Sequence, residues 1–118
     1  MNEQTSEKGL AGERQALAYL RQHGMRPVCQ RYRCPYGEID LVMLDGECLV
    51  FVEVKLRSRG RKNDGVLAVN FQKQQRLIRA ARCYLGEYPT EMPVRFDIVE
   101  ITGDGVFHLP NAFVGSEW

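Results

Sequence analysis

The alternation of apolar and polar residues is clearest from Gly37 to Lys55, where two apolar-rich runs flank Asp45-Gly46. An Asp-Gly pair between alternating runs is the strongest short signal for a two-residue hairpin turn. With these residues at its centre, the turn pairs Leu41 with Val50. Alternate residues point to opposite sides of a sheet, so one uncharged face is expected to be core. Its members are Ile39, Leu41, Met43, Cys48, Val50, Val52 and Val54.

The opposite face of this hairpin is apolar near the turn and charged at its far end, which carries Glu38, Asp40, Glu53 and Lys55. In the predicted register Glu38 lies opposite Glu53 and Asp40 lies opposite Phe51. Asp40 is then a diagonal neighbour of Glu53, within reach of a common point roughly 7–8 Å across. Like charges placed opposite each other repel, so something positive is expected there. The pattern fits either a bound hard cation or a salt-bridged surface patch.

Two stretches have the apolar periodicity of helices. The first runs to about His23, and Gly24 after it is a typical stop signal. Glu13 lies in the middle of the apolar stripe of this helix. Because burying an unpaired carboxylate is costly, Glu13 is expected either to pair with an arginine or to point at Asp40 and Glu53.

The second helix is predicted over about Phe71 to Gly86. Gln74 interrupts its apolar face and either joins the polar cluster or satisfies a buried backbone group. Strands are predicted over about Arg26 to Arg33, before the hairpin, and over Val94 to Ile101, with a short final strand from Val106 to Leu109. A strand, a crossover helix and another strand imply a parallel pair with a right-handed connection.

Length and composition place the chain among ordinary globular proteins. Its 118 residues suit a single domain over 1–118, and 44% of them are hydrophobic and 26% charged. No run approaches the roughly 18 apolar residues that span a bilayer, and the polar start lacks the apolar stretch of a signal peptide. These features predict a cytoplasmic protein without a membrane partner.

Basic residues are concentrated in one part of the chain. Nine basic residues and one acidic residue lie between Lys55 and Arg82, although the net charge of the whole chain is only +1. Such a cluster is either a solvated surface or a surface for a polyanion, and its position directly after the carboxylates favours nucleic acid. The residues predicted to bind nucleic acid are Arg57, Arg59, Arg61, Lys62, Lys73, Arg76, Arg79 and Arg82. The first four lie in a polar segment that either closes over a phosphate backbone or is a disordered linker.

Several motifs together resemble a known family. They are G-x-x-G-E-x-x-A-x-x-Y-L from Gly9 to Leu20, C-P-x-G-E-I-D-L from Cys34 to Leu41, F-V-E-V-K from Phe51 to Lys55 and R-F-D from Arg95 to Asp97. Over nearly its whole length the chain resembles the YraN-like family of small bacterial endonuclease-like proteins, within the PD-(D/E)XK superfamily. The resemblance implies a restriction-endonuclease-like α/β fold in the order αβββαβ. Its central mixed sheet joins an antiparallel three-stranded meander to a parallel fourth strand, flanked by two helices.

The resemblance also implies roles for particular residues. Asp40 and Glu53 match the acids of the superfamily motif, Lys55 matches its lysine, and Glu13 matches the helix glutamate of junction-resolvase-like members. These four residues would be catalytic, and Asp40, Glu53 and Glu13 would bind Mg²⁺ or Mn²⁺. Glu38 would be either an extra ligand or the partner of a basic side chain.

The function implied by the resemblance is a divalent-metal-dependent DNA endonuclease that hydrolyses phosphodiesters. Phosphate contacts carry little sequence information, so selectivity would be for shape, such as branched or flapped DNA. A junction with two-fold character would suit a homodimer. One alternative is a nucleic-acid-binding module on the same scaffold without cleavage activity of its own. Another is an assembly protein whose polar cluster is only structural.

Overall fold

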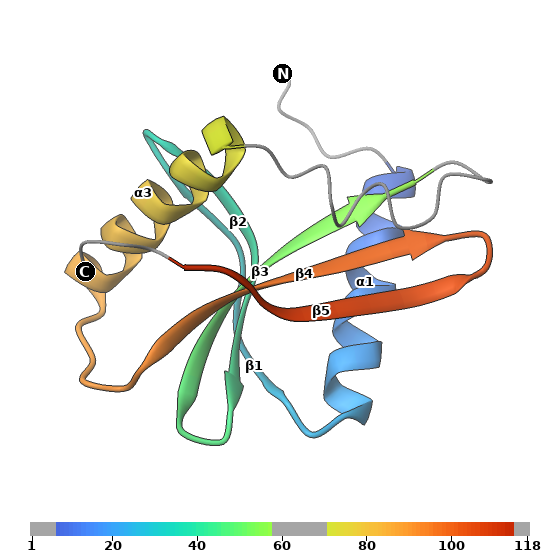
Figure 1. The fold of residues 1–118 in the computed structure, drawn as a ribbon, viewed down its shortest axis with the longest axis horizontal. Helices are drawn as coiled ribbons and strands as arrows, with labels where there is room; N and C mark the ends of the chain where they lie inside the picture. Colours follow the sequence, from blue (N-terminus) through green and yellow to red (C-terminus); the bar gives the residue numbers. More distant parts are fainter. Residues whose placement is uncertain (1–6, 58–70, 115–118) are drawn as a thin grey trace.

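A computed structural model describes residues 7–57 and 71–114, which form two helices and five strands (Figure 1). In chain order these are α1 (Glu7–Gln22), β1 (Arg26–Cys34), β2 (Gly37–Asp45), β3 (Cys48–Leu56), α3 (Phe71–Glu87), β4 (Val94–Thr102) and β5 (Gly105–Phe113). The predicted mixed α/β fold is confirmed, with the elements in the predicted order and a full fifth strand at the end. Neither described helix is long and apolar enough to cross a membrane.

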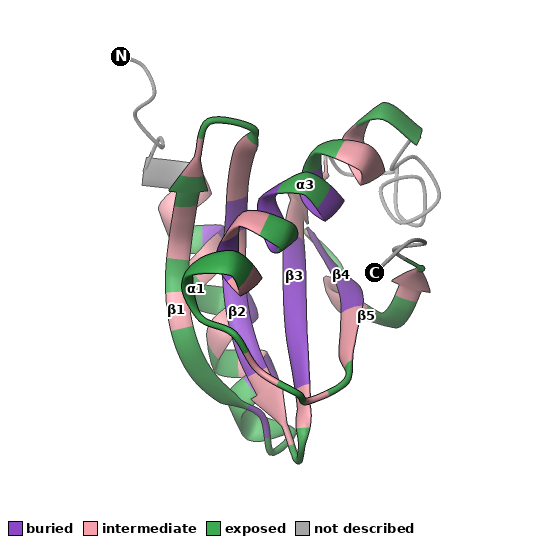
Figure 2. Ribbon diagram, turned by 90° about the vertical axis from the view of Figure 1, so that its left-hand side faces the viewer, coloured by how far each residue is buried: buried purple, intermediate pink, exposed green. Residues whose placement is uncertain are grey.

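One helix covers each face of the sheet, with α3 in front of the strands and α1 behind them in Figure 2. The strand order is β1-β2-β3-β4-β5, with β3 parallel to β4, as predicted, and all other neighbours antiparallel. Leu41 and Val50 belong to the core cluster under α1, whereas Phe51 and Phe96 belong to the cluster under α3. Because β2 and β3 are covered on both sides, a charged residue on them needs partners within the protein.

The hairpin of β2 and β3 forms where it was expected, but the predicted register is wrong by two residues. Leu41 pairs with Val52 rather than with Val50. The centre of the turn is therefore Gly46-Glu47. Gly46 has a φ of 61° and supplies a positive backbone angle at the first central position, where tight hairpin turns favour glycine. A shift of two residues leaves each side chain on its own face.

This shift changes which acids meet at the far end of the hairpin. The predicted pairs Glu38 with Glu53 and Asp40 with Phe51 do not form. The ladder ends at Leu41 and Val52. Beyond it, the backbone nitrogen of Val54 donates a hydrogen bond to Asp40 Oδ2, so Asp40 lies beside the segment of β3 that carries Glu53.

The alternation of faces is interrupted at the same end of β2. The prediction that Ile39 shares a face with Leu41 is wrong, because Ile39 packs in the cluster under α3 and Leu41 in the cluster under α1. On β1, Arg31 lies between the residues that pair with Leu41 and Ile39, and its φ is 55°. The left-handed residue on β1 thus lies across from the point at which β2 changes face.

The final strand, β5, is longer than predicted. Between β4 and β5 lies a polar network around the buried Asp97, which was not predicted. The carboxylate of Asp97 accepts hydrogen bonds from Arg95 Nε at 2.9 Å and from the backbone nitrogen of Asn111 at 2.9 Å. His108 Nε2 lies 2.8 Å from Asp97 Oδ2. Burial alone would raise the pKa of Asp97, but His108, Arg95 and Asn111 together hold it below its ordinary value. This network joins β4 to β5.

Replacing Asp97 with Asn should lower the free energy of unfolding by about 3 kcal/mol, because Arg95 and His108 lose a buried charged partner. Since the pKa of Asp97 is lowered, its carboxylate stabilises the fold above the ordinary value of 3.8, and this contribution is lost as the pH falls below it. Urea denaturation of both proteins, from neutral pH down to about pH 2, measures both effects. Asp104→Asn, in the exposed turn between β4 and β5, is the matched control. Equal stability of the wild type and Asp97→Asn at neutral pH would contradict the prediction.

Candidate functional site

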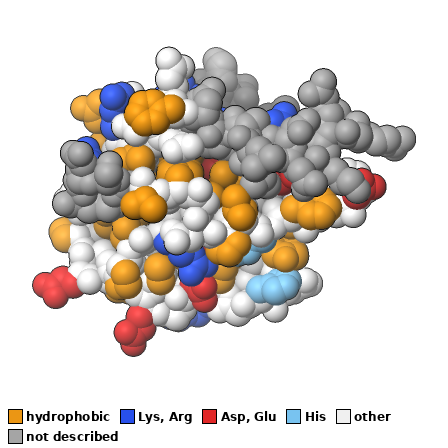
Figure 3. Space-filling view, viewed as in Figure 1, with side chains coloured by type: hydrophobic (Ala, Val, Ile, Leu, Met, Phe, Trp, Pro, Cys, Tyr) orange, Lys and Arg blue, Asp and Glu red, His pale blue; other side chains and the backbone are white. Residues whose placement is uncertain are grey.

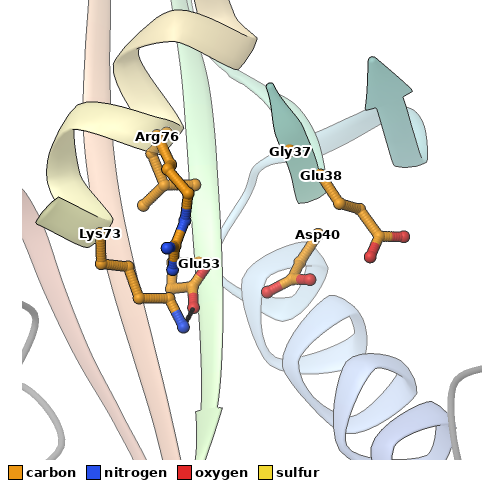
Figure 4. Close-up of a pocket in the computed structure, with 7 residues that line it drawn as sticks. Gly37, Glu38, Asp40, Glu53, Lys73 and Arg76 are labelled. Carbon is orange, nitrogen blue, oxygen red and sulfur yellow. Dashed lines mark ion pairs between the residues drawn. The ribbon is translucent and has the colours of Figure 1, made fainter. Parts of the chain in front are cut away.

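A pocket of about 220 Å³ opens at the acid end of β2 and β3, beside the first turns of α3 (Figure 4). It is lined by Gly37, Glu38, Asp40, Glu53, Lys73, Arg76 and Leu77. The pocket therefore brings two of the predicted metal-binding acids together with two of the residues predicted to bind phosphate.

The central feature of the pocket is the acid pair, Asp40 and Glu53. Figure 4 shows the carboxylate of Asp40 directed toward Glu53. Asp40 Oδ2 accepts a hydrogen bond of 2.7 Å from the backbone nitrogen of Val54, which fixes it against β3. Burial raises the pKa of Asp40 well above its ordinary value, and the charge of Glu53 raises it further. Two carboxylates this close repel each other, and a cation between them would relieve the repulsion.

Two lysines lie next to the acid pair. Lys73 Nζ is 2.9 Å from Glu53 Oε2, and Lys55 lies close enough to Lys73 for their charges to interact. Burial lowers the pKa of Lys55, and the positive charge of Lys73 lowers it further. Burial acts in the same direction on Lys73, but its contact with Glu53 raises its pKa overall. Lys73 thus brings positive charge to the acid pair.

Sequence reasoning placed Lys73 only among the phosphate-binding residues and missed its contact with Glu53. The signal was present in the spacing, because Lys73 precedes the buried Leu77 by four residues. Residues four apart lie on the same face of a helix. Lys73 therefore had to face the sheet rather than solvent.

Glu13 meets both expectations in part. Gly12 lets α1 lie close to the end of β3, since an added Cβ there would be only 2.6 Å from Leu56 Cδ2. This brings Glu13 to the acid end of the sheet, where its Oε1 lies 3.5 Å from Arg31 Nε. Burial raises the pKa of Glu13, Arg31 lowers it, and the charges of Glu38 and Glu53 raise it. Glu13 is thus close enough for the charge of Glu53 to affect its pKa. It is paired with Arg31, however, and does not line the pocket.

Glu38 is the partner of a basic side chain, which was one of the two roles left open for it. Its Oε2 lies 3.1 Å from Arg33 Nε. In Figure 4 its carboxylate is directed away from Asp40. The half-buried Gln74 lies in the next turn of α3 after Phe71 and does not line the pocket.

The predicted nucleic-acid-binding residues fall into three groups. Arg76, Arg79 and Arg82 are exposed along the outer side of α3, and Arg76 also lines the pocket. Arg57 is turned toward the protein, with its Nε 3.8 Å from Oε2 of the fully buried Glu100. Arg59, Arg61 and Lys62 lie outside the described residues.

The donor atoms of the pocket suit a hard divalent cation in an open site. Within residues 7–57 and 71–114, no three His, Cys, Asp or Glu side chains are gathered so as to hold an ion by themselves. Mg²⁺, however, keeps several waters and is usually held by one or two carboxylates together with substrate phosphates. Asp40 and Glu53 supply that number of carboxylates, so the residues present fit Mg²⁺ when a phosphate completes the site.

Comparison with known proteins gives one consistent match. Residues 12–101 match the model of an uncharacterised protein family, UPF0102. A UPF0102 protein of Legionella pneumophila (strain Philadelphia 1) is 41% identical over 92% of this chain and 96% of its own length. UPF0102 proteins of Janthinobacterium sp. (strain Marseille) and Shewanella amazonensis are 44% and 45% identical, over 88% and 89% of this chain and 85% and 97% of their own lengths. The matched segment contains Glu13, Asp40, Glu53 and Lys55.

Replacing Asp40 with Asn should stabilise the protein at neutral pH by about 1 kcal/mol, the usual scale for relieving strain at a functional site. The amide removes the buried like charge beside Glu53 but still accepts the hydrogen bond from Val54. Because the pKa of Asp40 is raised, the wild type loses stability as the pH rises above 3.8, the ordinary value, and the variant lacks that loss.

Urea denaturation at about pH 4 and at neutral pH measures this difference, which should be larger at neutral pH. Glu47→Gln, in the exposed turn between β2 and β3, is the control. A variant less stable than the wild type at neutral pH would mean that the Asp40 carboxylate is a structural group.

Proposed function

The chain belongs to the UPF0102 (YraN) family, and from the geometry of its pocket we propose that it is a divalent-metal-dependent DNA endonuclease. The proposal rests on the acid pair, Asp40 and Glu53. Asp40 and Glu53 both line a pocket open to solvent, where burial raises the pKa of Asp40 and the charge of Glu53 raises it further. Perturbed acids in a pocket are typical of functional sites.

Asp40 and Glu53 would hold the ion, with their hard oxygens and a substrate phosphate around it. When bound, Mg²⁺ supplies Lewis-acid polarisation of the phosphodiester and lowers the pKa of a water molecule. Lys55, close to Lys73 and to Glu53, would orient that water or stabilise developing negative charge. Arg76, at the wall of the pocket, is placed to donate hydrogen bonds to the phosphate.

Lys73 has a separate role in this proposal. Its ammonium group, 2.9 Å from Glu53, partly neutralises the acid pair. A phosphate that enters the pocket brings negative charge of its own, so it would gain an additional partner in Lys73. The exposed Arg79 and Arg82, further along α3, would contact the neighbouring phosphates of the strand.

A nucleic-acid-binding module without cleavage activity is the second candidate, and the Lys73–Glu53 ion pair favours it. A lysine that stays on Glu53 takes the place of a divalent cation and leaves Asp40 as the only carboxylate for a ligand. The basic side of α3 would still bind phosphates in that case. The two functions differ in whether metal produces cleavage.

The purified protein with Mg²⁺ or Mn²⁺ should nick at least one DNA in a panel of linear duplex, single-stranded, flap and four-way substrates. Glu53→Gln and Lys55→Ala should each lower the rate by about a hundredfold or more, as the loss of a catalytic group commonly does. Gel electrophoresis of end-labelled DNA measures the rate.

Glu47→Gln, in the exposed turn between β2 and β3, is the control and should cleave at the wild-type rate. DNA binding without metal-dependent cleavage anywhere in the panel would favour the binding module. Absence of both binding and cleavage would leave the assembly protein as the remaining hypothesis.

Replacing Arg79 with Ala should weaken DNA binding to a similar extent for all sequences and reduce the salt dependence of binding by about one counterion. The reason is that an exposed arginine on α3 would contact phosphate and not base edges. Fluorescence anisotropy at several salt concentrations in EDTA measures this slope. Arg21→Ala, at the end of α1 on the other face of the sheet, should leave it unchanged; equal slopes for both variants would contradict the prediction.

A further inference from the structure

An exposed aromatic side chain stands beside the pocket without a role in the proposed chemistry. Tyr36 lies in the two-residue turn between β1 and β2 and is 53% exposed. The next two residues, Gly37 and Glu38, line the pocket. A single exposed aromatic residue is common on protein surfaces, so its position is what matters here.

The turn that carries Tyr36 is held in place against α3. Pro35 fixes its own φ, and Gly37 has a φ of 152°, which other residues rarely adopt. An added Cβ at Gly37 would lie 3.9 Å from the carbonyl oxygen of Arg76. Tyr36 therefore lies in a short, restricted turn whose next residue, Gly37, comes close to the backbone of Arg76.

A second exposed aromatic residue lies at the start of α3, whose first turns line the pocket. Phe71, the first residue of α3, is 71% exposed and precedes Lys73 by two positions. Figure 3 shows hydrophobic and basic side chains next to one another over the start of α3 and the turn between β1 and β2. Aromatic rings interleaved with basic side chains are the combination by which proteins bind single-stranded nucleic acid.

We propose that Tyr36 stacks on an unpaired base next to the phosphate held in the pocket, so that the preferred substrate is single-stranded DNA or a single-stranded flap. In an intact duplex each base is already stacked on its neighbours, and its flat face is not available to a side chain. This inference rests on the proposed function in one respect, that the pocket takes a nucleic-acid phosphate. It does not depend on cleavage.

The test compares binding of a labelled oligothymidine and of a duplex of the same length, by fluorescence anisotropy in EDTA. Tyr36→Ala should weaken binding of the single strand by between about fivefold and about 150-fold, since one stacked base contributes about 1–3 kcal/mol. Duplex binding should change little. Tyr36→Phe should keep the wild-type affinity, because its ring stacks equally well. Tyr88→Ala is the matched control, since Tyr88 is 54% exposed and lies beyond the other end of α3.

Quenching of 2-aminopurine fluorescence within the single strand, present in the wild type and lost in Tyr36→Ala, would show stacking directly. Equal losses for single strand and duplex, or equal effects of Tyr36→Ala and Tyr88→Ala, would overturn the inference. Absence of binding to either DNA would overturn it as well. Cleavage with Mg²⁺ is scored separately. Cleavage that is insensitive to Tyr36→Ala removes only this inference, and Tyr36-dependent binding without cleavage removes only the proposed nuclease activity.

Discussion

The meeting of Asp40 and Glu53 on adjacent buried strands is the constraint on which the candidate site depends. Helices cover both faces of β2 and β3, so water screens these carboxylates poorly and each must find a partner within the protein. The backbone nitrogen of Val54 holds Asp40, and Lys73 holds Glu53. Burial raises the pKa of Asp40, and the remaining repulsion from Glu53 raises it further.

The helices are placed so that each adds charge to this acid pair. The first turns of α3 bring Lys73 and Arg76 over the pocket. On the other face, Gly12 allows α1 to come close to the end of β3, and Glu13 follows it directly. The positive charge of Arg31 partly offsets the negative charge of Glu13 near the site. The pocket is therefore nearly balanced in charge, which suits the proposed binding of both a cation and a phosphate.

The sequence predicted the helices and strands, their order and the parallel pair of strands. Apolar periodicity and a glycine after a helix are local signals, and a strand, a helix and a further strand imply a parallel pair. The sequence did not predict the hairpin register, because the pattern of side chains has a period of two and cannot distinguish registers that differ by two residues. It missed the partners of Asp97, since His108 and Asn111 are 11 and 14 residues away and meet it only after β4 and β5 pair. The contact of Lys73 with Glu53 likewise depends on the position of a helix over a sheet, although its spacing from Leu77 indicated the correct face.

Two aspartates of this sheet, the buried Asp97 and the half-buried Asp40, provide an internal comparison. Asp97 is surrounded by Arg95, His108 and Asn111, which lower its pKa, so its charge is fully compensated and its role is structural. Asp40 accepts a hydrogen bond from the backbone of Val54, but burial raises its pKa and the charge of Glu53 raises it further. An acid left under repulsion at the wall of an open pocket is a cost to stability, and such costs are found mainly where function requires them. This contrast is the strongest physical argument that the acid pair serves to bind a ligand rather than to hold the fold together.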